Sequence, residues 1–255
     1  MAIDVHCHLN DEAFNNDYKD IVGNFSADNI DYAIVSGYDV ESSEKAIEIA
    51  RLSERTYAAI GIHPENSKDC SLSDIEKLLP KYSDDKVVAV GEIGLDYHWK
   101  PFDESSQKEF FIRQLDIAEE VNLPVVIHQR DCGTDILEIL KAKKPRVPIV
   151  LHCFSESPEM CKVFLKINCY ISIGGVVTYK NANKLLDVAR IVPADMLLTE
   201  TDCPYLSPVP MRGKRNEPKY VNYVTETLAN LRGTTKEELE AQVLSNFKRI
   251  FTKIK

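Results

Sequence analysis

Short apolar runs alternate with longer stretches of helical periodicity along most of the chain. Runs such as KVVAVGEIG, LPVVIHQ and VPIVLHCF are apolar at nearly every position, as parallel strands covered on both faces are. Residues 106–121 place their apolar side chains on one stripe of a helix. Thr235 and Glu238 have the spacing of a capping box and predict the start of another helix. The buried face of that helix would consist of Leu239, Val243, Phe247 and Ile250.

The alternation predicts eight strands with helices between them. The strands are expected at residues 2–6, 32–36, 57–62, 87–92, 124–128, 148–152, 170–174 and 196–202. Eight strands and their helices in 255 residues, with 44% apolar composition, are typical of a single (β/α)8 TIM-type barrel. The competing fold is an open doubly wound sheet, but neither a GxGxxG nor a Walker A loop occurs in the sequence. We therefore expect residues 1–255 to form one α/β barrel domain.

Six side chains that can bind a metal fall at or beside the C-terminal ends of the predicted strands. They are His6, His8, Glu92, His128, His152 and Asp202. The chain has six histidines, and four of them occupy these places. In such a barrel these strand ends meet at the face where catalytic groups collect. Gathering four imidazoles and two carboxylates there is costly unless a cation joins them, so the set predicts a metal centre.

The number of ligands favours two ions that share a bridge, because one tetrahedral site needs four ligands. Glu92 is the expected bridge, since a carboxylate has two oxygens and a neutral imidazole offers one lone pair. The first ion would be held by His6, His8 and Asp202, and the second by His128 and His152. The second ion would keep positions open for water or substrate. Glu92 and Asp202 are the predicted catalytic residues, with Asp202 also accepting a proton from the attacking water.

Charge and composition limit the function classes. The net charge of −9 argues against broad attraction to nucleic acid. Two divalent ions with Glu92 and Asp202 would nevertheless leave a local charge of about +2, which attracts a phosphate. No apolar run approaches the ~20 residues of a membrane span, and no signal peptide is recognisable. We expect a cytoplasmic monomer with no membrane contact, whose seven scattered cysteines are reduced.

Taken together, these segments resemble the TatD family of metal-dependent deoxyribonucleases, within the amidohydrolase-like barrel superfamily. The resemblance is carried by DVHCHL, GIHPEN, GEIGLDYH, VIHQRD, LHCFSE, ISIGGVVTYKNA, TETDCPYLSP and RGKRNEP, between residues 4 and 218. It implies the same six ligands, a metallo-dependent hydrolase barrel, DNA as the partner, and magnesium-supported hydrolysis of phosphodiester bonds, commonly from the 3′ end. By ligand type, four imidazoles favour manganese or zinc. We expect two divalent ions, Mg²⁺ or Mn²⁺ for activity, with Zn²⁺ as an alternative occupant.

Substrate contacts are predicted for five side chains around the ligands: His63, Arg130, Tyr205, Arg212 and Arg215. The arginines would bind phosphates, because a guanidinium group can do so bidentately. The tyrosine would stack on a base. Each has a structural alternative: a turn histidine, a solvated basic loop, or a tyrosine packed behind a proline.

Further predictions concern the neighbours of the ligands. Glu200 is placed to orient a ligating imidazole. Cys7, Cys153 and Cys203 each adjoin a ligand, and strand alternation predicts that they point away from it.

Three positions depart from the family pattern: Asn10 replaces aspartate, Gln129 replaces serine and Glu156 replaces glycine. None is a ligand, but Glu156 would add negative charge near the mouth of the barrel, which leaves the substrate open. One alternative is an amidohydrolase-type deaminase, lactonase, esterase or aminoacyl-tRNA deacylase. Another is a non-catalytic binding protein that retains a metal.

Overall fold

The predicted strands form one parallel sheet in chain order in the computed structural model, which describes residues 1–254. The strands are β1 (Ala2–Cys7), β2 (Ile30–Ser36), β3 (Thr56–Ile60), β4 (Val87–Asp96), β5 (Val125–Arg130), β6 (Ile149–Leu151), β7 (Cys169–Ile173) and β8 (Leu197–Thr199). Backbone hydrogen bonds join the two ends of the sheet: Asp202 N donates to His6 O at 2.9 Å, and His8 N donates to Cys203 O at 2.8 Å. The sheet therefore closes into a barrel, and the predicted (β/α)8 fold is confirmed.

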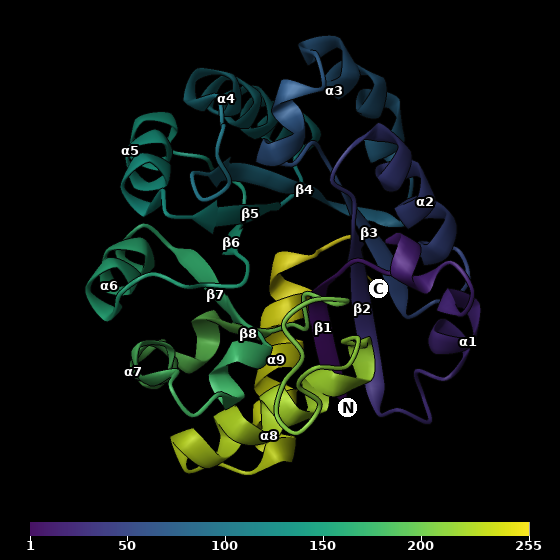
Figure 1. Ribbon diagram of the computed structural model, residues 1–255, viewed down its shortest axis with the longest axis vertical. Coiled ribbons are helices and arrows are strands. Elements are labelled where there is room, and N and C mark those ends of the chain that lie inside the picture. The colour runs from purple at the N-terminus through teal and green to yellow at the C-terminus, as the bar shows by residue number, and fades with distance from the viewer. Residues whose placement is uncertain (255) are drawn as a thin grey trace.

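Helices surround the strands in chain order (Figure 1). They are α1 (Tyr18–Gly23), α2 (Val40–Ala50), α3 (Leu72–Leu78), α4 (Glu104–Val121), α5 (Gly133–Lys143), α6 (Pro158–Lys166), α7 (Asn183–Ile191), α8 (Val221–Arg232) and α9 (Lys236–Ile250). Short 3-10 helices are η1 (Glu12–Phe14), η2 (Pro64–Lys68), η3 (Leu79–Ser83), η4 (Gly175–Thr178), η5 (Ala194–Met196) and η6 (Pro218–Tyr220). Two helices, α8 and α9, follow β8 and lie beside the N-terminal strand β1 (Figure 1). Within residues 1–254, no helix combines the length and apolar character that a bilayer crossing needs.

The C-terminal helix α9 begins where its sequence predicts. Thr235 and Glu238 form the expected capping box, in which each side chain accepts a backbone N–H of the other residue. The predicted apolar face is buried, with exposed fractions of 0–3% for Leu239, Val243, Phe247 and Ile250. Both signals are local to the helix, which explains why the sequence alone could place it.

Strands β6 and β8 are shorter than predicted. They end at Leu151 and Thr199, so His152 and Asp202 lie in the irregular backbone just beyond them. Asp202 has a positive φ of 57°, and Cys153, directly after His152, has a positive φ of 42°. Aspartate adopts this left-handed conformation more readily than most residues, whereas cysteine does not. The alternation of side chains that holds along a strand is therefore lost at these positions.

A close approach of two strands positions part of the functional site. Gly94 in β4 pairs with His128 in β5 and has a φ of +143°, a conformation that L side chains rarely adopt. A Cβ atom at Gly94 would lie 2.0 Å from His128 O. Glycine is thus required where β4 passes the strand that carries His128.

Candidate metal centre

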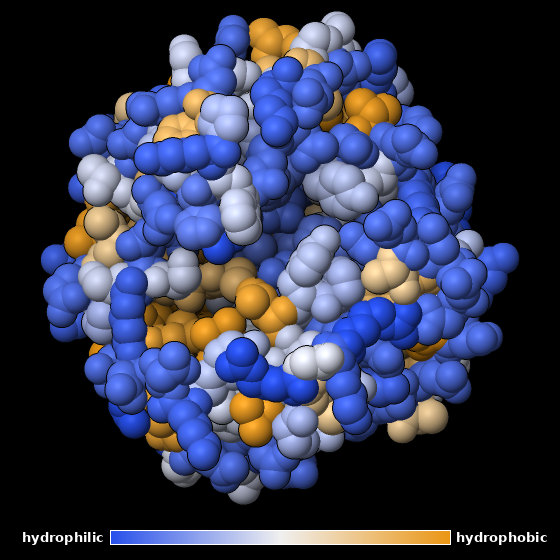
Figure 2. Space-filling view, viewed as in Figure 1, coloured by the Kyte–Doolittle hydropathy of each residue, from blue (hydrophilic) through white to orange (hydrophobic). Residues whose placement is uncertain are grey.

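A cavity of about 760 Å³ opens where the C-terminal ends of the strands meet. Five of the six predicted ligands line it: His8, Glu92, His128, His152 and Asp202. The sixth, His6, is fully buried and lies in contact with this group. The space-filling view shows the face drawn to be hollowed near its centre, with apolar atoms along one edge of the hollow (Figure 2). Side chains from distant parts of the sequence are thus brought together as the strand ends predicted.

Four ligand atoms form a first group at the end of β1. His6 Nε2 lies 3.1 Å from His8 Nε2 and 3.2 Å from Glu92 Oε2. Asp202 Oδ1 lies 3.4 Å from His8 Nε2 and 3.7 Å from His6 Nε2. Donor atoms around one tetrahedral ion, each at ~2.1 Å, lie about 3.4 Å apart. The four atoms therefore match the spacing that a single ion requires.

A second group faces the other oxygen of the same carboxylate. Glu92 Oε1 lies 2.7 Å from His152 Nε2 and 2.8 Å from His128 Nδ1. The two imidazole nitrogens are 3.2 Å apart. His63 Nε2 is farther away, at 3.5 Å from Glu92 Oε1. Each oxygen of Glu92 thus faces its own set of nitrogen donors, which is the arrangement that a bridging carboxylate needs.

The hydrogen-bond partners of the imidazoles decide which nitrogen faces the centre with a lone pair. His8 Nδ1 lies 3.0 Å from Ser36 O, and a carbonyl can only accept, so His8 Nε2 carries the lone pair. His128 Nε2 donates to Asp96 Oδ2 at 2.9 Å, so its Nδ1 presents a lone pair to Glu92. Lone pairs aimed at carboxylate oxygens over these distances repel unless a proton or a metal ion lies between them. The donor set therefore fits a divalent cation.

The pKa shifts of Glu92 and His152 also favour a divalent cation at this site. Burial alone would raise the pKa of Glu92, but the imidazoles of His152, His6 and His63 outweigh it and hold that pKa well below its ordinary value. Burial would likewise lower the pKa of His152, but Glu92 and Glu200 outweigh it and raise that pKa well above its ordinary value. Both shifts have the same cause, the close approach of an acidic and a basic group in a buried site, and a divalent cation between them would take the place of the proton.

Ser36 orients His6 of β1 and His8, which lies just beyond the end of that strand. Its Oγ lies 3.1 Å from His6 Nδ1, and its carbonyl accepts from His8 Nδ1. Asn10 supports the same carbonyl, because its Nδ2 donates to Ser36 O and to Ser42 O, each at 3.0 Å. An aspartate, which the family pattern has at this position, lacks this donor. The departure at Asn10 is therefore part of the support for the histidine pair.

Asp96 is a site residue that the sequence reasoning missed. It is 1% exposed, lines the cavity and accepts from His128. The prediction ended the fourth strand at Glu92, whereas β4 continues to Asp96. An even spacing of four residues along one strand places both carboxylates on the same face, and this signal in GEIGLDY was available. Glu200 was predicted to orient an imidazole, and its Oε1 lies 3.5 Å from His152 Nδ1.

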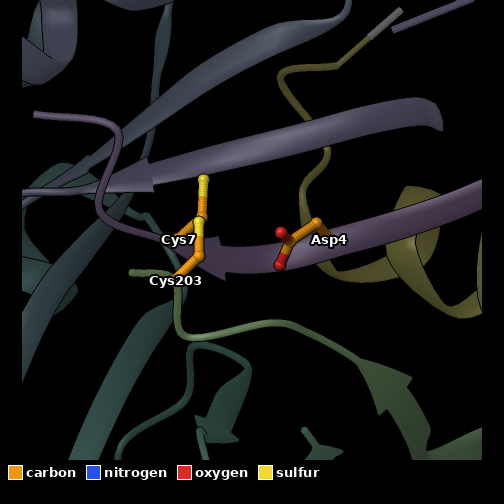
Figure 3. A group of neighbouring side chains, drawn as sticks. All are labelled: Asp4, Cys7 and Cys203. Carbon is orange, nitrogen blue, oxygen red and sulfur yellow. The ribbon is translucent and has the colours of Figure 1, made fainter. Parts of the chain in front are cut away.

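Behind the ligands, Cys7 and Cys203 lie side by side with Asp4 (Figure 3). Both thiols are fully buried, and Cys7 Sγ donates to Ile34 O, so they point away from the cavity as strand alternation predicts. Asp4 accepts from Thr201 N at 2.8 Å and from Thr201 Oγ1 at 2.5 Å. These bonds tie β1 to the segment that carries Asp202, so Asp4 holds the two halves of the first group together.

Cys153 does not follow the same prediction. It lines the cavity, because it lies beyond the end of β6 in the left-handed conformation. The prediction that it points away from the ligands is therefore wrong. All seven cysteines lie within the described residues and are free thiols.

Three of the five predicted substrate contacts line the cavity: His63, Arg130 and Tyr205. His63 Nδ1 accepts from Glu65 N at 3.2 Å, so the neutral ring carries its proton on the Nε2 that faces the site. His63 is thus arranged as a hydrogen-bond donor rather than as a ligand. Tyr205 lies at the rim, 55% exposed, and its hydroxyl donates to Asp11 Oδ2 at 3.2 Å.

Arg212 and Arg215 are not among the residues that line the cavity. Arg215 donates to both carboxylate oxygens of Asp17, at 3.0 and 2.6 Å, and covers the ring of Phe14. Arg212 lies over the ring of Tyr179, with its Cζ 4.1 Å from the ring centroid. The structure therefore gives both guanidinium groups partners within the chain, and their contact with a substrate stays a prediction.

Glu156 is likewise absent from the lining of the cavity. A Cβ atom at Gly133, the first residue of α5, would lie 2.7 Å from Glu156 Oε1. The carboxylate is thus directed to the N-terminus of a helix, where negative charge is favourable. The structure does not place this charge in the mouth of the barrel.

The charges around the cavity are mostly negative. Five carboxylates line it: Asp11, Glu65, Glu92, Asp96 and Asp202. Within residues 1–254, Arg130 is the one lysine or arginine among the lining residues. An anionic substrate would be repelled here unless bound cations offset the carboxylates. Bound cations would offset this negative charge, and the donor set of the cavity fits them.

Comparisons with known proteins extend over the whole barrel. A family model described as TatD related DNase matches residues 3–252. The chain is 42% identical over 252 residues to the uncharacterized metal-dependent hydrolase YabD of Bacillus subtilis, covering 98% of this chain and 99% of that protein. It is 38% identical over 255 residues to the uncharacterized metal-dependent hydrolase YcfH of Escherichia coli K12, covering 98% and 96%. The crystal structure of YJJV, a TatD homolog from Escherichia coli K12, matches with a TM-score of 0.94 at 30% identity, covering 98% of each chain.

Proposed function

This chain belongs to the TatD family of metal-dependent hydrolases, and from that premise we propose that it is a deoxyribonuclease that removes nucleotides from the 3′ end of a DNA strand. We propose that two divalent ions, Mg²⁺ or Mn²⁺, serve this reaction, with Zn²⁺ as an alternative occupant. The observation that carries the proposal is the division of the Glu92 carboxylate between two sets of nitrogen donors. A pair of ions across one carboxylate suits the two oxygens that exchange at a phosphorus atom.

The distances to the two oxygens of Glu92 support a division of the ligands between two ions. His6, His8 and Asp202 would hold one ion and His128 and His152 the other, with Glu92 between them. When bound, the pair would act as a Lewis acid on a phosphate and lower the pKa of a bound water to near neutrality.

The side chains around the ligands supply the remaining steps. Burial would raise the pKa of Asp202, but His8, His152 and His6 outweigh it and lower that pKa, so the carboxylate is ready to accept a proton from water. His63 directs Nε2–H into the site, where it can donate to a phosphate oxygen. Arg130 lines the cavity with its charge available for the same phosphate.

The test uses a single DNA strand labelled at its 5′ end. The protein is stripped with a chelator, reloaded with Mg²⁺ or Mn²⁺ and incubated with the strand. We expect a ladder of products shortened stepwise from the 3′ end, absent without metal and absent in His128→Ala and Asp202→Ala. An intact strand at high enzyme concentration, together with turnover of a small ester or amide, would refute the nuclease and favour the amidohydrolase-type alternative. An Arg146→Ala variant, altered on an exposed arginine outside the cavity, serves as the matched control.

A further inference from the structure

Trp99, the one tryptophan of the chain, lies on the wall of the cavity between β4 and α4. It is 58% exposed. The His98 ring packs against it edge to face, with centroids 4.8 Å apart and an interplanar angle of 89°. A large indole ring that is held at a cavity mouth and left open to solvent is a surface on which a planar ligand can stack.

Arg130 supplies a cation next to this ring. Its Cζ lies 5.2 Å from the centroid of the Trp99 ring, within the range of a cation–π contact. Within residues 1–254, no carboxylate pairs with its guanidinium group, whereas Arg215 is held by Asp17 and Glu217. The N–H donors of the guanidinium group are therefore available to an anion.

The wall beside Arg130 holds a further group that the fold does not use. Gln129 lines the cavity and is 3% exposed. Neither its amide nitrogen nor its amide oxygen has a hydrogen-bond partner in residues 1–254. Buried polar atoms are rarely left without partners in a folded protein. A donor and an acceptor thus lie unused in the wall of the cavity that Arg130 and Trp99 also line.

We propose that Trp99 and Arg130 form a nucleotide subsite beside the metal centre. The indole stacks on a nucleobase, and the guanidinium group binds a phosphate of the same strand. This proposal rests on the proposed function and takes a strand with an unpaired end as the ligand, because a base inside a duplex has both faces covered by its neighbours. The cavity of about 760 Å³ has the size of a site for a small ligand, ~300–1,000 Å³, and suits a strand end rather than a long duplex contact.

Tryptophan fluorescence reports the subsite directly, because all of the protein's tryptophan emission comes from Trp99. The probe is thymidine 5′-monophosphate, which carries a base but no phosphodiester bond that could be cleaved. We expect it to quench the emission saturably in the metal-loaded protein. Deoxyribose 5-phosphate, which has the phosphate but no base, should leave the emission nearly unchanged. Equal responses to both probes, or no response to either, would overturn the proposal.

Kinetics on DNA test the same subsite during turnover. Trp99→Ala should raise KM for an unpaired strand about 5- to 150-fold, the range of stacking on one base, with little change in kcat. Trp99→Phe should restore most of the affinity, because it keeps an aromatic face. On a strand whose two 3′-terminal residues are abasic, Trp99→Ala and the wild type should have equal KM values.

Arg130→Ala isolates the phosphate contact. The slope of log KM against log salt concentration should become shallower by about 0.7, the value for one phosphate contact to a single strand. Arg146→Ala, the control that alters an exposed arginine outside the cavity, should leave the slope unchanged.

Failure of the subsite and failure of the proposed function give different results. Cleavage by the wild type that is unaffected by Trp99→Ala, on intact and abasic strands alike, overturns the subsite and leaves the nuclease standing. If the wild type cleaves no strand, the proposed function fails, and the fluorescence titration alone decides the subsite. Quenching that depends on the base then supports it, and quenching that does not depend on the base refutes it.

Discussion

Replacing Asp96 by alanine should selectively weaken the binding of one of the two proposed metal ions. Asp96 Oδ2 accepts from His128 Nε2 at 2.9 Å and leaves the lone pair of Nδ1 facing Glu92. Without this acceptor, the imidazole loses the partner that fixes both its orientation and its tautomer. His6 and His8 are oriented by Ser36 instead, so the first group of ligands keeps its partners.

The expected magnitude follows from this contact. Removing a carboxylate that hydrogen-bonds a metal-ligating histidine costs about 10- to 100-fold in metal affinity, or roughly 1.4–2.8 kcal/mol. Burial acts to raise the pKa of Asp96, but His128 outweighs it and lowers that pKa, so the carboxylate is ionised at neutral pH and the hydrogen bond is charge-assisted. This places the expected loss toward the upper part of the range.

The assay is a titration of the stripped protein with Mn²⁺ against a chromophoric chelator, analysed for two sites. We expect one dissociation constant to rise by one to two orders of magnitude in Asp96→Ala and the other to change less than about threefold. Asp131→Ala is the matched control, because Asp131 contacts His98 and no predicted ligand. An equal loss at both sites, or none at either, would refute the assignment of Asp96 to His128 and of His128 to one ion.

Four further predictions concern packing, the barrel seam, acid stability and metal removal. Gly94→Ala places a Cβ atom 2.0 Å from a backbone oxygen at a positive φ, and strain of about 2 kcal/mol should lower Tm by about 4–8 °C in calorimetry; an unchanged Tm would contradict the close approach. Thr201→Val removes one hydrogen-bond donor from the buried Asp4 carboxylate and should lower the free energy of unfolding in urea by about 1–3 kcal/mol. An unchanged free energy of unfolding would contradict this hydrogen bond. Hydrogen bonds from Lys108 and Tyr97 lower the pKa of Asp135, so its contribution to stability is present above the unfolded-state pKa and is lost as the pH falls through the folded-state pKa. The free energy of unfolding of the wild type should therefore exceed that of Asp135→Asn by about 1 kcal/mol at pH 7 and by almost nothing near pH 2. A difference that does not change with pH would contradict the pairing. Chelation of metal present at ~100 times its Kd should remove about 2.7 kcal/mol of stability, visible as a fall in Tm, and a Tm indifferent to chelator would argue against a bound metal.

Much of the fold was predictable because the barrel buries both faces of its strands. Burial on both faces produces continuous apolar runs, and these runs marked all eight strands. The six ligand candidates were predicted from the ends of those runs, since a barrel brings its strand ends to one face. The structure gathers the other five around Glu92.

The remaining details depend on geometry that local patterns do not contain. β4 extends past Glu92 to Asp96, and Asp96 was therefore placed outside the strand and missed. Cys153 turns into the cavity because its backbone is left-handed beyond β6. The partner of Arg215 is Asp17, about 200 residues earlier in the chain, and such a distant pairing has no local signal in the sequence.

Whether six side chains hold two ions across one carboxylate is tested most directly by a crystal grown in Mn²⁺ and measured at the manganese absorption edge. We expect two anomalous peaks about 3.5–4 Å apart, one on each side of Glu92. The peak beside Glu92 Oε2 should contact His6, His8 and Asp202, and the peak beside Oε1 should contact His128 and His152. A single peak, or side chains separated around a site that takes up no manganese at saturating concentration, would contradict this expectation.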